Sequence, residues 1–178
     1  MLRACLAIAP FVFCLVANAA PDPFPAPIEP AGQGKLQCHQ PNHEKKTCQS
    51  LAGYDRAAGG GFENTARVAM PISPLMVMET VSPITIRDQQ VCGFIRQTDI
   101  DTARFTVGGV EASGADTANY RKRVAAMYGS MFGHEICTAY VPDGKDLVTR
   151  VIVDGRPVPA MSQRVSWVSP SDGYRVSN

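Results

Sequence analysis

Short runs of alternating apolar and polar residues are the strongest pattern in this chain. Strand-length runs of this kind occur at residues 62–70, 75–80, 84–87, 91–96, 104–107, 135–141, 147–153 and 165–168. Alternation with period two is typical of strands with one buried face. The segments Asp88-Gln89-Gln90, Asp143-Gly144 and Asp154-Gly155 separate neighbouring runs, and such residues favour hairpin turns. The pattern therefore predicts a mostly antiparallel sheet.

One segment has the spacing of a long helix, at about Asp116–Phe132. Its apolar side chains recur on a single face, at Tyr120, Val124, Met127, Tyr128 and Met131. Ser113 followed by Asp116 is a capping-box pattern, and Gly133 is a stop signal. The strands and this helix together predict the α+β class: a mostly antiparallel sheet with one long amphipathic helix, held by disulfides.

The first 19 residues predict a secretory signal peptide. Arg3 supplies the positive charge, an apolar run covers Ala4–Val16, and Ala17-Asn18-Ala19 is a small-x-small cleavage pattern. An apolar run of about 13 residues is too short to span a membrane, which takes about 20. We therefore expect a periplasmic or secreted protein that has no membrane span after the signal is cleaved.

Proline dominates residues 20–34, which we interpret as a linker. Pro21, Pro23, Pro25, Pro27 and Pro30 remove backbone donors and fix φ, which disfavours a helix interior or a central strand. Residues 35–178 are then expected to form a single domain, a length typical of one domain.

Four cysteines remain after the predicted cleavage, and an exported chain favours their oxidation. Four cysteines allow three connectivities. We favour Cys38–Cys48, which closes a polar segment poor in core residues, and Cys92–Cys137, which ties the front of the sheet to its back.

A metal site is the competing interpretation of the first pair. Cys38, His39, His43 and Cys48 are all zinc-ligand types. Adjacent ligands at Cys38 and His39 fit one ion poorly, and oxidation would consume the thiolates. We therefore expect neither a metal nor a cofactor, and we retain metal handling as an alternative function.

Charge and motifs exclude several function classes. Of the 17 basic and 16 acidic residues, only Arg3 lies in the predicted signal, so the remainder carries 16 of each and no net charge. A neutral chain lacks the electrostatic footprint of a nucleic-acid-binding protein. No GxSxG motif is present. A hydrolase site would have to be assembled from scattered carboxylates such as Glu63, Glu79 and Asp99.

Two aromatic residues near the C-terminus are candidates for partner binding. Trp167 and Tyr174 lie in the segment VSWVSPSDGYRV, and exposed Trp and Tyr side chains often anchor protein interfaces. The competing interpretation of Trp167 is a core residue of the last strand.

Four stretches, CQSLAGYDRAAGGGFENTA, VCGFIRQTDI, HEICTAYVPDG and VSWVSPSDGYRV, resemble small exported bacterial proteins of unknown function. The resemblance spans most of residues 48–176. It implies export and a single domain, and it assigns no role to any residue.

These observations favour an exported, non-enzymatic domain that binds a protein or an envelope component. The alternatives are an envelope hydrolase with a carboxylate site and a metal-handling periplasmic protein. The sequence alone does not decide whether the protein is an enzyme.

Overall fold

The computed structural model describes residues 23–71 and 73–177. The predicted signal peptide, residues 1–19, and its cleavage junction lie outside the described residues. Most of the regular structure consists of strands that pair with antiparallel neighbours.

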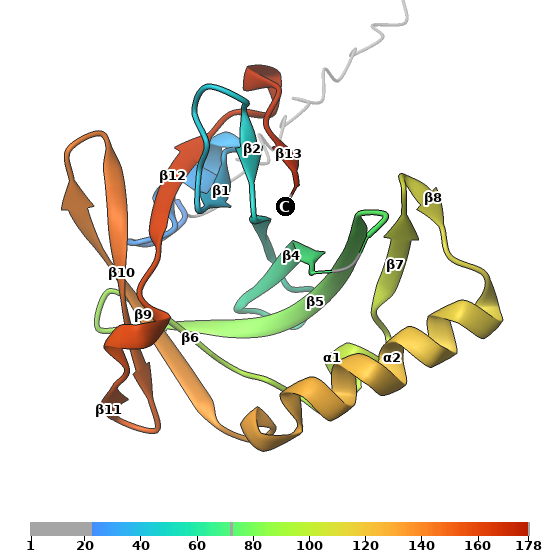
Figure 1. The fold of residues 1–178 in the computed structure, drawn as a ribbon. Coiled ribbons are helices and arrows are strands. Elements are labelled where there is room, and N and C mark those ends of the chain that lie inside the picture. The colour runs from blue at the N-terminus through green and yellow to red at the C-terminus, as the bar shows by residue number, and fades with distance from the viewer. Residues whose placement is uncertain (1–22, 72, 178) are drawn as a thin grey trace, which may run out of the picture.

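Eight of these strands form a closed antiparallel barrel (Figure 1). They are β1 (Leu36–His39), β3 (Ser50–Arg56), β4 (Phe62–Met70), β5 (Met76–Arg87), β6 (Gln90–Phe94), β9 (Glu135–Asp143), β10 (Asp146–Val153) and β12 (Arg164–Val168). Their order around the barrel is β4-β3-β1-β12-β10-β9-β6-β5, and β5 pairs with β4 to complete the circle.

The predicted α+β class is therefore wrong. The described part of the chain is mostly β, with 48% of it in strands, and the sheet closes on itself instead of serving as a layer for helices. Alternation along single strands revealed most of the strands. It carries no information about closure, which depends on β1 pairing with β12 and on β4 pairing with β5.

The barrel interior has a polar centre. Tyr54 on β3 and Tyr140 on β9 lie four strands apart in the barrel order, yet their hydroxyl oxygens are 3.4 Å apart. Both hydroxyls donate to Oε1 of Gln37, at 2.8 and 3.1 Å. Gln37 is fully buried, and among the described residues its Nε2 has no hydrogen-bond partner. Burial is the main cause that raises the pKa of both phenols, and for Tyr54 the rise is large.

The proline-rich segment packs against the barrel from Pro23 onward. A short 3-10 helix, η1 (Glu29–Gln33), follows Ile28, which is completely buried. Ile28 belongs to an apolar cluster with barrel residues that include Tyr54 and Ile84, and Trp167 packs against it. Pro30 lies in the first turn of η1, where its missing N–H has no partner to lose, so the composition that excludes a regular helix still permits this turn.

A helical segment and a hairpin extend one side of the barrel. They comprise α1 (Gln97–Asp101), β7 (Arg104–Val107), β8 (Val110–Glu111), α2 (Gly114–Tyr128) and η2 (Gly129–Met131). Strand β7 pairs with the first half of β5, and α2 runs beneath it (Figure 1). The expected cap is confirmed, because Ser113 Oγ accepts from the Asp116 N–H at 3.2 Å. Val124 is buried beside Met76 and Phe105, whereas Met127 is 57% exposed.

The C-terminal segment covers part of the outer surface. Here β13 (Arg175–Val176) pairs in parallel with β2 (Thr47–Cys48). They cover an outer apolar cluster that contains Cys38, Leu51 and Val168. The remaining short elements are β11 (Arg156–Pro157), η3 (Pro159–Met161) and η4 (Pro170–Asp172).

Both favoured disulfides are present, Cys38–Cys48 and Cys92–Cys137. Disulfides form and persist in oxidising compartments, so the two bonds suggest an extracellular or periplasmic environment.

Candidate functional site

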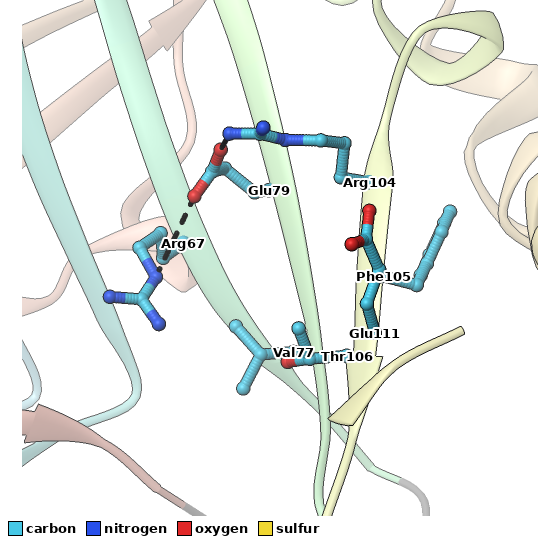
Figure 2. A pocket seen from close by; sticks show the side chains of 7 residues that line it. All are labelled: Arg67, Val77, Glu79, Arg104, Phe105, Thr106 and Glu111. Atoms are coloured by element: carbon cyan, nitrogen blue, oxygen red, sulfur yellow. Dashed lines mark hydrogen bonds and ion pairs between the residues drawn. The ribbon is translucent and has the colours of Figure 1, made fainter. Parts of the chain in front are cut away.

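The outer face of β4, β5, β7 and β8 carries a groove of about 220 Å³ (Figure 2). It is lined by Arg67, Val77, Glu79, Arg104, Phe105, Thr106 and Glu111. Strand register explains most of this set, because opposed residues on neighbouring strands share a face. Arg67 opposes Glu79, and Glu79 opposes Arg104, which forms one charged row across three strands. The adjacent row runs from Val77 through Thr106 to Glu111.

Glu79 is held between the two guanidiniums of its row (Figure 2). Arg104 Nη2 donates to Glu79 Oε1, and Arg67 Nε lies 3.8 Å from Glu79 Oε2. The hydrogen bond from Arg104 to Glu79, aided by the charges of Glu79 and Glu111, raises the pKa of Arg104. Both carboxylate oxygens of Glu79 face guanidiniums, so Glu79 serves as the counter-charge that orients them.

The guanidiniums remain accessible to a ligand. The side chain of Arg67 is 55% exposed and that of Arg104 is 70% exposed, whereas that of Glu79 is 24% exposed. A guanidinium has five N–H donors, and contact with one carboxylate uses only some of them. The row therefore presents two partly occupied forks on either side of a fixed carboxylate.

The side chains of this row are of the kind that proteins use to bind anions. Arginine forks bind carboxylates and phosphates through paired, charge-assisted hydrogen bonds. The charged row has a formal charge of +1, and Glu111 adds a negative charge beside it. An acidic side chain in an extended segment can bridge the forks, while Val77 and the Thr106 methyl group offer apolar contact.

A second polar cluster lies on the outer surface near the Cys38–Cys48 disulfide. His43 Nδ1 is 2.7 Å from the Tyr174 hydroxyl, and His43 Nε2 is 3.1 Å from Asp146 Oδ1. Ser166 Oγ donates to the same oxygen of Asp146, which is buried. Burial raises the pKa of Asp146, but the hydrogen bonds from Ser166 and His43 outweigh it and hold the pKa below its usual range.

This cluster has the atoms of a hydroxyl–imidazole–carboxylate relay, but its position indicates a structural role. Tyr174 packs against the outer apolar cluster around Cys38 and Cys48. The relay joins the β1–β2 loop to the segment before β13, so it fastens the C-terminal segment to the barrel.

The two aromatic candidates for partner binding lie in different places. Trp167 packs in the apolar cluster around Ile28, with its ring 6.2 Å from that of Tyr54. Tyr174 packs on the outer cluster instead. The two side chains therefore do not form one continuous surface.

The zinc-ligand candidates are already engaged in other contacts. Cys38 and Cys48 are bonded to each other, which removes both thiolates. His39 Nδ1 is 3.2 Å from Gln163 Oε1, and burial lowers the pKa of His39. Over residues 23–71 and 73–177, no group of three or more His, Cys, Asp and Glu side chains could hold a metal ion.

The scattered carboxylates are not brought together into one acid–base site. Asp99 accepts from Ser82 and from Arg96 beside α1, whereas Glu79 lies in the groove row. Sequence reasoning named Glu79 but missed Arg67 and Arg104. Both arginines lie in predicted strands, so the signal was present. Their convergence on Glu79 requires the register between three strands.

Comparisons of the chain with known protein families, with curated proteins and with solved structures find no match. In the described part of the chain, no helix has the length and apolar character needed to cross a membrane.

Proposed function

We propose that this protein is an exported, non-enzymatic binding module whose groove holds an acidic segment of a partner protein. The observation that carries this proposal is the row in which Glu79 orients Arg67 on one side of it and Arg104 on the other. Guanidiniums that are already oriented lose less conformational freedom when a ligand binds, which improves affinity.

The strands that carry the charged row also support the proposal. Its residues lie on β4, β5 and β7, which are paired along their lengths, so the groove floor is rigid. Two disulfides suit a protein that works in the periplasm or outside the cell. We assign the export to the predicted signal peptide, residues 1–19.

Hydrolysis is a poorer fit to the same groove. Glu79 and Glu111 do share it, but a glycosidase-type mechanism needs one protonated carboxyl group as the acid. Both carboxylate oxygens of Glu79 already face guanidiniums. The geometry therefore favours binding of an anion over acid catalysis.

A direct test uses a hexaglutamate peptide as the probe. We expect chemical-shift changes at residues of the groove and saturable binding that weakens as salt rises. The double variant Arg67→Ala/Arg104→Ala should lose this binding. The charge-matched control Lys122→Ala/Arg150→Ala, at two exposed positions away from the groove, should retain it.

Capture from envelope extracts then tests the partner. A protein retained by the wild type and by the control pair, but lost by the groove pair, would support the proposal. No saturable partner, or equal retention by all three forms, would contradict it. Circular dichroism of each variant separates loss of binding from loss of fold.

A further inference from the structure

The Cys92–Cys137 disulfide has a cation beside both of its sulfurs. Cys92 and Cys137 oppose each other on β6 and β9 and face the outside of the barrel. Arg87, at the end of β5, places Nη2 3.4 Å from Cys137 Sγ and 3.7 Å from Cys92 Sγ. The same nitrogen donates to Glu135 Oε2 at 2.8 Å, which fixes the guanidinium over the disulfide.

A guanidinium at this distance favours the thiolate form of a cysteine. A nearby positive charge lowers a thiol pKa, and a thiol of lower pKa is a better leaving group in thiol–disulfide exchange. The hydrogen bond to Glu135 raises the pKa of Arg87, so the cation persists. The Arg87 side chain is 54% exposed, so the buried disulfide lies beneath a single side chain that faces solvent.

The other disulfide lies in a different setting. Cys38 and Cys48 are 0% and 1% exposed within an apolar cluster under the C-terminal segment, and Cys38 Sγ lies near the Thr47 carbonyl oxygen. Apolar surroundings raise the pKa of a thiol. Cys92 and Cys137 are also buried, at 1% and 7% exposed, so the two bonds differ in the cation beside their sulfurs and in what covers them, a single arginine side chain in one case and the C-terminal segment in the other.

We infer that Cys92–Cys137 is a thiol-exchange site, which a dithiol reductant opens while Cys38–Cys48 stays oxidised. A thiolate of the dithiol attacks Cys92 Sγ and forms a mixed disulfide. The Cys92–Cys137 bond breaks, and its electron pair leaves on Cys137 Sγ beside Arg87. The second thiol of the dithiol loses its proton and attacks its partner sulfur, which releases the Cys92 thiolate. The dithiol becomes a cyclic disulfide, and water protonates the released thiolates.

The barrel does not depend on this bond for closure. Strands β6 and β9 are also joined by the register pairs Val91–Thr138, Gly93–Ile136 and Phe94–Glu135. Reduction therefore leaves the β6–β9 ladder in place, so the exchange is reversible in the folded protein.

The test is a reduction series on the purified mature chain. Dithiothreitol is added in steps, free thiols are trapped with iodoacetamide, and the modified cysteines are identified by peptide mass. We expect Cys92 and Cys137 to be labelled at concentrations that leave Cys38 and Cys48 protected, with an unchanged circular-dichroism spectrum.

Arginine variants test the part played by the cation. The rate of reduction should fall about threefold or more in Arg87→Ala, while Arg87→Lys should keep most of the wild-type rate because it keeps a cation. Arg123→Ala, at an exposed arginine of α2, is the control and should react as the wild type does. Simultaneous labelling of all four cysteines, or an Arg87→Ala variant that reacts as fast as the wild type, would overturn the inference. The order of labelling in the wild type decides the question even if Arg87→Ala fails to fold.

Discussion

Replacing Ile28 with alanine tests whether the proline-rich segment belongs to the folded unit. Ile28 is 0% exposed and packs in the cluster that contains Tyr54 and Ile84, so the change removes three buried carbons. At about 0.8 kcal/mol for each carbon, the lost burial alone is about 2.4 kcal/mol. The space left in the cluster adds to this cost, and isoleucine-to-alanine changes in cores span about 2–5 kcal/mol. We expect the free energy of unfolding to fall by about 3 kcal/mol.

Urea unfolding followed by tryptophan fluorescence is the appropriate assay. Trp167 is the single tryptophan of the chain and packs against the same cluster, so its emission reports on this region. With a urea slope of about 2 kcal/mol per molar, the midpoint should fall by about 1.5 M.

The neighbouring Glu29→Ala variant is the control, because Glu29 is exposed in the same segment. Its free energy of unfolding should stay within about 0.5 kcal/mol of the wild type. If Ile28→Ala costs no more than Glu29→Ala, the segment is a linker in solution and the reasoning from its burial is refuted.

Two further changes test individual contacts. Asp146→Asn should lower the free energy of unfolding by about 2 kcal/mol at pH 7, because Ser166 and His43 lose a charged acceptor. Since the pKa of Asp146 is lowered in the folded state, this stabilisation is present above the unfolded pKa of about 3.9 and is lost as the pH falls through the folded pKa. The difference in free energy of unfolding between wild type and variant, measured by chemical unfolding, should thus shrink below about pH 4. A difference that stays constant with pH would refute this reasoning, and so would an equal difference for the exposed control Asp143→Asn. Ser113→Ala should destabilise the protein by about 1 kcal/mol through loss of the α2 cap, and Ser113→Asp should restore most of it in thermal unfolding.

Local patterns predicted most of the longer strands and the long helix. Strands β4 and β7 have the bounds expected from alternation, and the helix begins at the expected cap. Two runs expected to be separate, 75–80 and 84–87, form the single strand β5. The turn at Asp88-Gln89 joins β5 to β6, and the pairing of these two strands confirms the predicted hairpin.

Strands β1 and β3 were missed because both of their faces are covered. Gln37 and Cys38 are consecutive and both buried, the first in the barrel and the second under the C-terminal segment. On β3, Leu51 and Ala52 are likewise consecutive and both buried. A strand covered on both faces does not alternate, so its sequence lacks the period-two signal.

The candidate groove could be predicted only in part, for a related reason. The charges of Arg67, Glu79 and Arg104 are visible in the sequence, but 25 positions separate Glu79 from Arg104. Their meeting depends on β4 and β7 both pairing with β5, and no local pattern specifies that register.

The pairing of β1 with β12 has a consequence for how the chain folds. It joins Leu36 near the start of the described chain to Val168 near its end, so this ladder must close a loop of more than a hundred residues. Non-local pairing of this kind is slow, because chain entropy is lost before the contacts form. During synthesis, the earlier hairpins can form while β1 and β10 remain open edges. Each edge exposes unpaired backbone groups, which invite pairing with other chains. The last barrel strand, Arg164–Val168, thus acts as a closing step that removes two aggregation-prone edges at once.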